Sequence, residues 1–119
     1  MRVKDVLGEY GERLAAEHLL ADGMTLLERR WRCPIGELDL VALDGRCLVV
    51  CEVKTRRSTA TGVPIEAVTA AKLLRLRRLT AAWLEVHRTT YPDVRIDVVG
   101  VLVPRDGAGP VVDHVRGVA

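Results

Sequence analysis

The sequence has no phenylalanine, and aromatic residues make up only 3% of its 119 residues. Hydrophobic residues nevertheless reach 49%, so any core must consist of Leu, Val, Ile and Ala. Aliphatic cores are common in α/β domains, where helices cover a sheet. The length suits one ordinary domain and no linker divides it, so we expect residues 1–119 to form a single domain.

Membrane segments and paired cysteine spacings are also missing from the sequence. No run approaches 18 consecutive apolar residues, and the charged N-terminus lacks an apolar signal core. We therefore expect a cytoplasmic protein. Cys33, Cys47 and Cys51 show no C-x-x-C spacing and are expected to be buried, reduced thiols. The histidines are scattered along the chain and predict no ligand pair.

One stretch, residues 36–54, carries ionisable groups inside apolar runs: GELDLVALDGRCLVVCEVK. Its pattern predicts two strands, over 37–43 and 46–54, with a hairpin turn at Asp44 and Gly45. Apolar strands rarely accept ionisable groups without a chemical reason. The stretch is therefore the first candidate for a functional site.

The register of this hairpin decides which charged side chains meet. A turn with an even number of residues centred on Asp44-Gly45 places Glu37 opposite Glu52 and makes Asp39 and Glu52 diagonal neighbours. Because side chains alternate between the faces of a strand, four ionisable residues are predicted to share one face at one end of the hairpin. They are Glu37, Asp39, Glu52 and Lys54.

The remaining elements follow from hydrophobic periodicity and from helix end signals. The pattern predicts a helix over 5–22 ended by Gly23, a strand over 24–33, a polar loop over 55–62, a long helix over 64–88, and strands over 91–103 and 111–115. The loop is either a connector or a basic flap over a phosphate backbone. Trp31 is either a packing residue or a base-stacking platform.

Three further ionisable residues have two readings each. In the first helix Glu9 belongs to a solvent-facing ladder of charges, whereas Glu12 aligns with small and apolar residues. Helical spacing leaves open whether Glu12 faces the sheet or the solvent. Lys72 lies within the apolar face of the second helix, so it either extends out to solvent or lies near the charged sheet end. Asp97 is either a site residue or an ion-pair partner of Arg95.

Carboxylates that meet at one sheet end repel one another unless protons or a cation neutralise them. Their oxygen atoms suit Mg²⁺ or Mn²⁺, and a lysine on the same face can orient an attacking water or balance transition-state charge. Basic residues could hold a polyanionic substrate, although each cluster could equally be a solvated face. The candidates for nucleic-acid binding are Lys72, Arg56, Arg57, Arg30, Arg32 and Arg75.

A family resemblance supports this interpretation. Asp39 followed by Glu52-Val53-Lys54 resembles the D…(D/E)-x-K signature of restriction-endonuclease-like nucleases. The wider frame, from about Gly8 to Val99, consists of GEYGERLAAEHLL, WRCPIGELDLVA, LVVCEVKTRR, GVPIEAVTAAK and RIDVV. It resembles the YraN-like family of predicted bacterial endonucleases, relatives of archaeal Holliday-junction resolvases.

The resemblance implies an α/β fold with a restriction-endonuclease-like αβββαβ core, in which two main helices flank a mixed central sheet. It implies Glu12, Asp39 and Glu52 as acidic metal-site residues, Lys54 as the catalytic lysine and Lys72 as a phosphate contact or site support. Glu37 is a further candidate that either binds metal or stabilises the turn. The chain departs from the pattern at Arg30, where an Asn is expected, and at Ile96, where an aromatic residue is usual.

The sequence therefore predicts a nuclease that uses Mg²⁺ or Mn²⁺ to cut DNA, including branched, flapped or single-stranded forms. The alternative is a non-catalytic nucleic-acid-binding or adaptor module built on a nuclease scaffold. A third reading treats the carboxylates as ordinary strand-end charges. A homodimer is expected by analogy with the resolvases, with 98–103 and the last strand as candidate faces.

Overall fold

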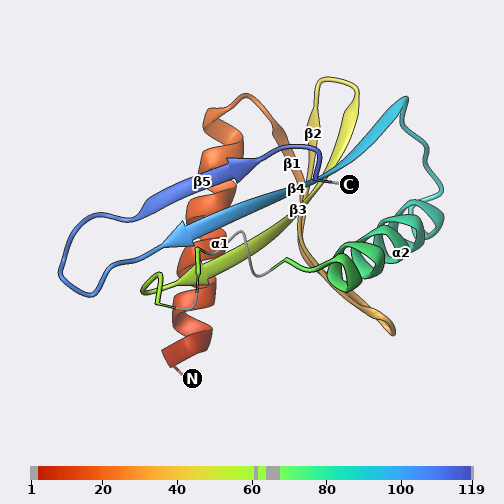
Figure 1. Ribbon diagram of the computed structural model, residues 1–119. Helices are drawn as coiled ribbons and strands as arrows, with labels where there is room; N and C mark the ends of the chain where they lie inside the picture. Colours follow the sequence, from red (N-terminus) through yellow and green to blue (C-terminus); the bar gives the residue numbers. More distant parts are fainter. Residues whose placement is uncertain (1–2, 61, 64–67, 119) are drawn as a thin grey trace.

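The computed structural model describes residues 3–60, 62–63 and 68–118. Its elements, in chain order, are α1 (Val3–Ala21), β1 (Thr25–Cys33), β2 (Gly36–Asp44), β3 (Cys47–Arg56), α2 (Ala70–Val86), β4 (Asp93–Leu102) and β5 (Val111–Val115). The expected fold class is confirmed: an αβββαβ core with one added strand forms a mixed sheet flanked by two helices (Figure 1).

The five strands follow one another in the sheet in the order β1-β2-β3-β4-β5. The pairs β1–β2, β2–β3 and β4–β5 are antiparallel, whereas β3 and β4 run parallel. A parallel pair cannot be joined by a hairpin, so the chain crosses over through α2 between β3 and β4. This connection brings the start of α2 close to the end of β3.

The helices cover opposite faces of the sheet (Figure 1). On one face, Ala15, Ala16 and Leu19 of α1 pack against aliphatic side chains of β2, β3 and β4. On the other, Leu76, Leu79 and Trp83 of α2 pack against a second cluster that Trp31 joins from β1. Trp31 is thus a packing residue. The largely aliphatic core predicted from composition fills both layers.

The β2–β3 hairpin differs from the prediction by two positions in register. Its turn consists of Gly45 and Arg46, and Asp44 pairs with Cys47. Gly45 has φ +60° and takes the first turn position, the one at which a type II′ turn requires glycine. Over the paired segment, a shift of two residues leaves the alternation of side chains between the faces unchanged, but it changes the partners, so Leu43 lies opposite Leu48 rather than Arg46. Beyond that segment the alternation breaks, because Leu38 packs on the α2 side whereas Leu40 packs on the α1 side.

The second helix begins later than predicted. Val68 and Thr69 are not helical, and α2 starts at Ala70 because the Thr69 hydroxyl caps it by accepting a hydrogen bond from the Lys72 backbone N–H, 3.2 Å away. The proposed start at Pro64 lies outside the described residues. The spacing of apolar residues in the sequence places Val86 on the buried face of this helix, but it is 65% exposed at the helix end. The third strand runs two residues beyond its predicted end, through Arg56.

Two expectations about composition can be compared with the structure. Cys33, Cys47 and Cys51 are free thiols, as predicted, and Cys51 is fully buried whereas the other two are half-buried. Among the described residues, no helix combines the length and apolar character that crossing a membrane requires.

Helix α1 lies very close to β3 at Gly11. A Cβ atom at this position would lie 1.8 Å from the Thr55 hydroxyl oxygen and 2.8 Å from the Thr55 Cβ. Gly8, one turn earlier, has no atom within 4 Å of its corresponding position. The absence of a side chain at Gly11 therefore sets how near the helix, and Glu12 with it, comes to the end of β3.

Substitution Gly11→Ala should lower the free energy of unfolding by about 1–3 kcal/mol, because the methyl group forces α1 and β3 apart. The matched variant Gly8→Ala should be neutral or stabilising by roughly 0.5–1 kcal/mol, since alanine favours the helix and meets no obstacle. Urea unfolding of both variants measures the difference. Equal stabilities would contradict the close approach.

Candidate functional site

Strands β2 and β3 part at the point where the predicted carboxylates lie. The β2–β3 ladder ends with the pair Leu40 and Cys51. Beyond it β3 continues beside β4 as far as Arg56, whereas β2 continues beside β1. Figure 1 shows the two strands diverging. Asp39 and Glu52 are the next residue on each strand, so they lie where the strands separate.

The side chain of Asp39 accepts a hydrogen bond from β3 just beyond the end of the β2–β3 pairing. Its Oδ2 accepts a hydrogen bond of 2.9 Å from the backbone N–H of Val53. Burial, followed by the hydrogen bond and negative charge of Glu52, raises the pKa of Asp39 to about 8. The predicted neighbours Asp39 and Glu52 are therefore in contact, and the pair retains a proton near neutral pH.

Helix α1 supplies a third carboxylate. Glu12 is half-buried, which settles the open reading in favour of the sheet side. Burial raises its pKa; the hydrogen bond from Arg30 acts against this, and the charges of Asp39 and Glu37 add to the rise. Glu12 lines the same hollow as Val53 and Lys54, so α1 brings it to the part of β3 that carries Glu52.

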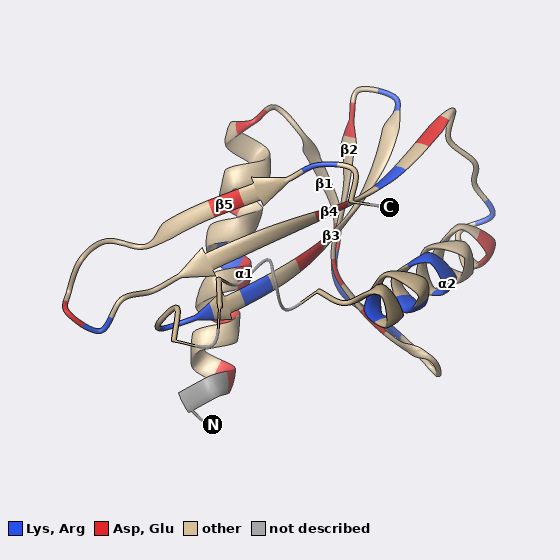
Figure 2. Ribbon diagram, in the orientation of Figure 1, with Lys and Arg blue, Asp and Glu red and all other residues tan. Residues whose placement is uncertain are grey.

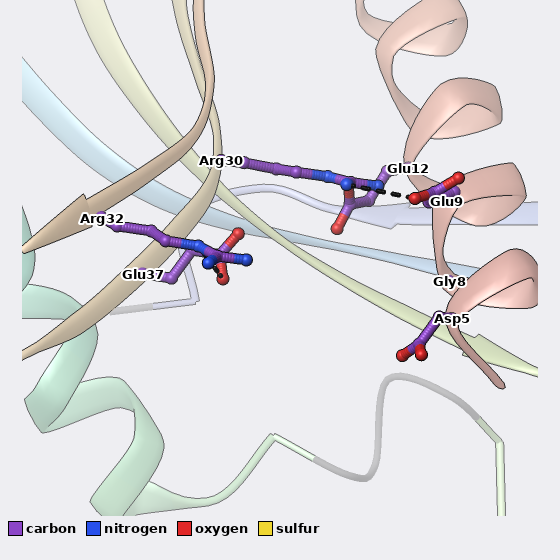
Figure 3. A pocket seen from close by; sticks show the side chains of 7 residues that line it. All are labelled: Asp5, Gly8, Glu9, Glu12, Arg30, Arg32 and Glu37. Carbon is purple, nitrogen blue, oxygen red and sulfur yellow. Dashed lines mark hydrogen bonds and ion pairs between the residues drawn. The ribbon is translucent and has the colours of Figure 1, made fainter. Parts of the chain in front are cut away.

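Arg30 of β1 is held by acidic side chains. Its Nε donates to Glu12 Oε2 at 2.6 Å, and its Nη1 lies 3.4 Å from Glu9 Oε1. Glu9 thus reaches across to a strand rather than forming the predicted ladder along its own helix. Figure 3 shows Arg30 extending from β1 towards both glutamates. Contact of Arg30 with phosphate stays a prediction.

Glu37 lies at the edge of this cluster. It forms an ion pair with Arg32, whose Nε lies 3.5 Å from Glu37 Oε2. Together with Glu12, Arg30 and Arg32 it lines a cleft of about 460 Å³ (Figure 3). Because the register is shifted, Glu37 does not lie opposite Glu52. It is a rim residue of the cleft rather than a member of the central pair.

Two lysines, Lys54 and Lys72, lie near Glu52. Lys54 follows Glu52 by two residues on β3, and Lys72 lies in the first turn of α2. The neighbouring Lys54 side chain lowers the pKa of Lys72, and burial lowers it further. The same neighbourhood includes Glu52. Lys72 is therefore beside the charged sheet end, as one of its two readings required.

Basic residues lie near the end of β3 and along α2, next to the acidic group (Figure 2). Lys54 and Arg56 share a hollow of about 270 Å³ with Glu12, and Arg75 is exposed on the first half of α2. Within the part of the chain that the structure describes, the Nε atoms of Arg56 and Arg57 are buried without a hydrogen-bond partner. These groups could hold a polyanion beside the carboxylates.

Asp97 belongs to a different network and is fully buried. It accepts hydrogen bonds from Arg95 Nε at 3.0 Å and from the Gly117 backbone N–H at 2.9 Å, which fits its structural reading. His114 Nε2 lies 2.8 Å from the same carboxylate, and His114 Nδ1 lies 3.1 Å from His18 Nε2. The sequence predicts no ligand pair among the histidines, yet the fold brings His18 and His114 within hydrogen-bond distance of each other. His18 and His114 are 96 residues apart in the sequence, and the pairing of β5 with β4 brings them together.

The raised pKa of Asp39 predicts how stability depends on pH. A carboxyl whose pKa is higher in the folded protein binds more protons when folded, so stability should fall as pH rises from about 4 towards 8 and level off above that. Asp39→Asn mimics the protonated acid. In a chelating buffer it should raise the free energy of unfolding by roughly 1–3 kcal/mol at pH 8.5, with little effect near pH 4.

Urea unfolding between pH 4 and 9 tests this expectation. The matched control is Asp93→Asn, an exposed aspartate at the opposite end of β4. The difference in free energy of unfolding between Asp93→Asn and the unsubstituted protein should not change over the same pH range. A destabilised Asp39→Asn variant at pH 8.5 would contradict the assigned protonation.

Comparison with known proteins places this site within a family. Residues 11–101 match the family described as "Uncharacterised protein family UPF0102". The UPF0102 protein of Beutenbergia cavernae is 59% identical over 118 residues, covering 99% of each chain. That of Kineococcus radiotolerans is 57% identical over 120 residues, covering 100% of this chain and 98% of its own. The match contains Glu12, Asp39, Glu52, Lys54 and Lys72, and the chain belongs to the UPF0102 family.

Proposed function

We propose that this protein is a metal-dependent nuclease that hydrolyses phosphodiester bonds in DNA, including branched, flapped or single-stranded substrates. The observation that carries the proposal is the contact between Asp39 and Glu52 where β2 and β3 part, with Lys54 and Lys72 beside it. Paired carboxylates next to paired ammonium groups are the parts that such hydrolysis requires.

The acidic residues fit a divalent cation. The pKa of about 8 at Asp39 means that the pair lacks enough positive charge to ionise fully at neutral pH. Carboxylate oxygens are the ligands that Mg²⁺ and Mn²⁺ prefer. Asp39 and Glu52 would hold the ion, and Glu12 would join them on release from Arg30. When bound, such an ion polarises a phosphate oxygen and lowers the pKa of a water molecule.

The lysines act on the substrate rather than on the carboxylates. Lys54, carried by the rigid strand β3, is placed to orient the attacking water or to balance negative charge on the phosphate in the transition state. Lys72 has a lowered pKa because Lys54 repels its charge. A phosphate between the two ammonium groups would remove this repulsion, which supports Lys72 as a phosphate contact.

The basic surface supports a long polyanionic substrate. Buried guanidinium N–H groups of Arg56 and Arg57 without a partner in the described residues need an acceptor, and phosphate oxygens are suitable acceptors for arginine. Arg75 continues the basic surface along α2, and Arg32 is exposed on β1. Phosphate contacts of this kind bind without reading base sequence.

The proposal predicts cleavage of DNA that depends on Mg²⁺ or Mn²⁺ and on the central residues. Asp39→Asn, Glu52→Gln and Lys54→Met should each lower the cleavage rate by about 100-fold or more, because each removes charge at the reacting phosphate. The measurement uses a panel of junction, flap, single-stranded and duplex DNA at several metal concentrations. Asp93→Asn and a chelator serve as the controls.

Unchanged cleavage by the three variants together would identify a contaminating nuclease and contradict the proposal. Absence of cleavage across the whole panel, combined with salt-sensitive DNA binding that needs no metal, would favour the non-catalytic binding module instead.

The basic surface generates a separate prediction for binding. Lys72→Gln and Arg75→Gln should weaken DNA binding to a similar extent for all sequences, and each should reduce the slope of log K against log salt by about 1. Fluorescence anisotropy with the Lys54→Met variant, between low and moderate salt, measures the slopes. Arg46→Gln, in the exposed turn at the other end of β3, should leave the slope unchanged.

A further inference from the structure

The described part of the chain contains a second group of potential metal-ligating side chains, separate from the carboxylates at Asp39. His18 lies in the last turn of α1, Asp22 follows the helix, and His114 lies on β5. One ligand atom from each of these residues lies within 4.8 Å of the other two. His18 follows Glu12 by six residues, about 9 Å along the helix axis, so the group lies at the C-terminal end of α1 and Glu12 near the middle of the helix.

The orientation of His114 favours metal binding. Its Nε2 lies 2.8 Å from Oδ2 of Asp97, a carboxylate that is 0% exposed. A carboxylate accepts and does not donate, so this contact keeps the proton on Nε2 and leaves the lone pair of Nδ1 directed away from Asp97. A buried carboxylate behind a histidine is the usual arrangement that orients a metal-binding imidazole.

The two imidazoles have a spacing that one ion can span. Nδ1 of His114 lies 3.1 Å from Nε2 of His18. Ligand nitrogens on tetrahedral Zn²⁺ lie about 3.3 Å apart, as Zn–N distances near 2.0–2.1 Å require. Only small side-chain movements would therefore replace the hydrogen bond between the rings by two bonds to an ion.

The surroundings allow an ion to enter. The side chain of His114 is 7% exposed, whereas Asp22 is exposed. The group therefore opens to solvent on the Asp22 side. Asp22 is paired with Arg116, which also contacts Asp44 at 3.4 Å. If Asp22 turned to an ion, Arg116 would keep Asp44 as a partner.

We propose that His18, Asp22 and His114 bind a transition-metal ion of the Zn²⁺ class. Two imidazoles and one carboxylate suit such an ion better than Mg²⁺, and a water molecule would occupy the fourth position. β5 is an edge strand joined to the sheet only through β4 among the described strands. The ion ties this strand to α1, and its role is to hold the C-terminal strand in place.

Metal-free protein titrated with Zn²⁺ in a calorimeter, and with Co²⁺ in a visible spectrometer, tests this site. The titrations use the Asp39→Asn, Glu52→Gln double variant, so that failure of the nuclease proposal does not affect them. We expect one equivalent bound, with the visible bands of tetrahedral Co²⁺ and a rise in the melting temperature with Zn²⁺.

His18→Gln, added to the double variant, should lower Zn²⁺ affinity at least about tenfold and reduce the rise in melting temperature at a given Zn²⁺ concentration. It leaves the contact between His114 and Asp97 intact, so the fold is retained. The matched control is His87→Gln, which removes the remaining histidine, at the end of α2, and should bind Zn²⁺ unchanged. No Zn²⁺ binding, or binding insensitive to His18→Gln, would overturn the proposal.

Discussion

The hydrogen bond from the Val53 backbone N–H to Asp39 is the contact on which the site depends. Where β2 leaves β3, the next backbone donors of β3 lose their partners on that side, and a buried N–H without an acceptor is costly. Asp39 supplies the acceptor and is thereby fixed against Glu52. The neighbouring helices complete the group: Gly11 lets α1 bring Glu12 close, and Thr69 begins α2 so that Lys72 meets Lys54.

The parts of this arrangement that follow from local chemistry could be predicted from the sequence. Alternation along β2 and β3 placed Asp39 and Glu52 on one face correctly, although the turn was set one residue too early and the register was wrong by two. The error was harmless because the side-chain period of a strand is also two. Lys72 was predicted near the charged sheet end by one of two readings, and its position in the first turn of α2 agrees with that reading.

The parts that depend on distant contacts could not be predicted. Divergence of β2 from β3 has no local signal, and the pairing of His18 with His114 requires β5 to lie across α1.

Arg30 is a partial exception. It has φ +50°, a left-handed conformation that Asn tolerates better than other residues, and the family resemblance led us to expect Asn there. The backbone at this position fits that expectation, while the arginine side chain adds contacts to Glu9 and Glu12.

The way each carboxylate is neutralised identifies the centre of the site. Glu12 has Arg30 and Glu37 has Arg32, so a second positive charge would gain little at either residue alone. Asp39 and Glu52 are both half-buried, the charge of Lys54 only partly offsets the effect of burial on the pKa of Asp39, and Asp39 keeps a proton instead. A cation that displaces this proton gains the attraction of both carboxylates in a place of reduced dielectric, where such attraction is strong. We therefore expect a divalent ion to bind most favourably between Asp39 and Glu52. This is the physical reason to expect the chemistry between β2 and β3, rather than in the cleft that Arg30 and Arg32 line.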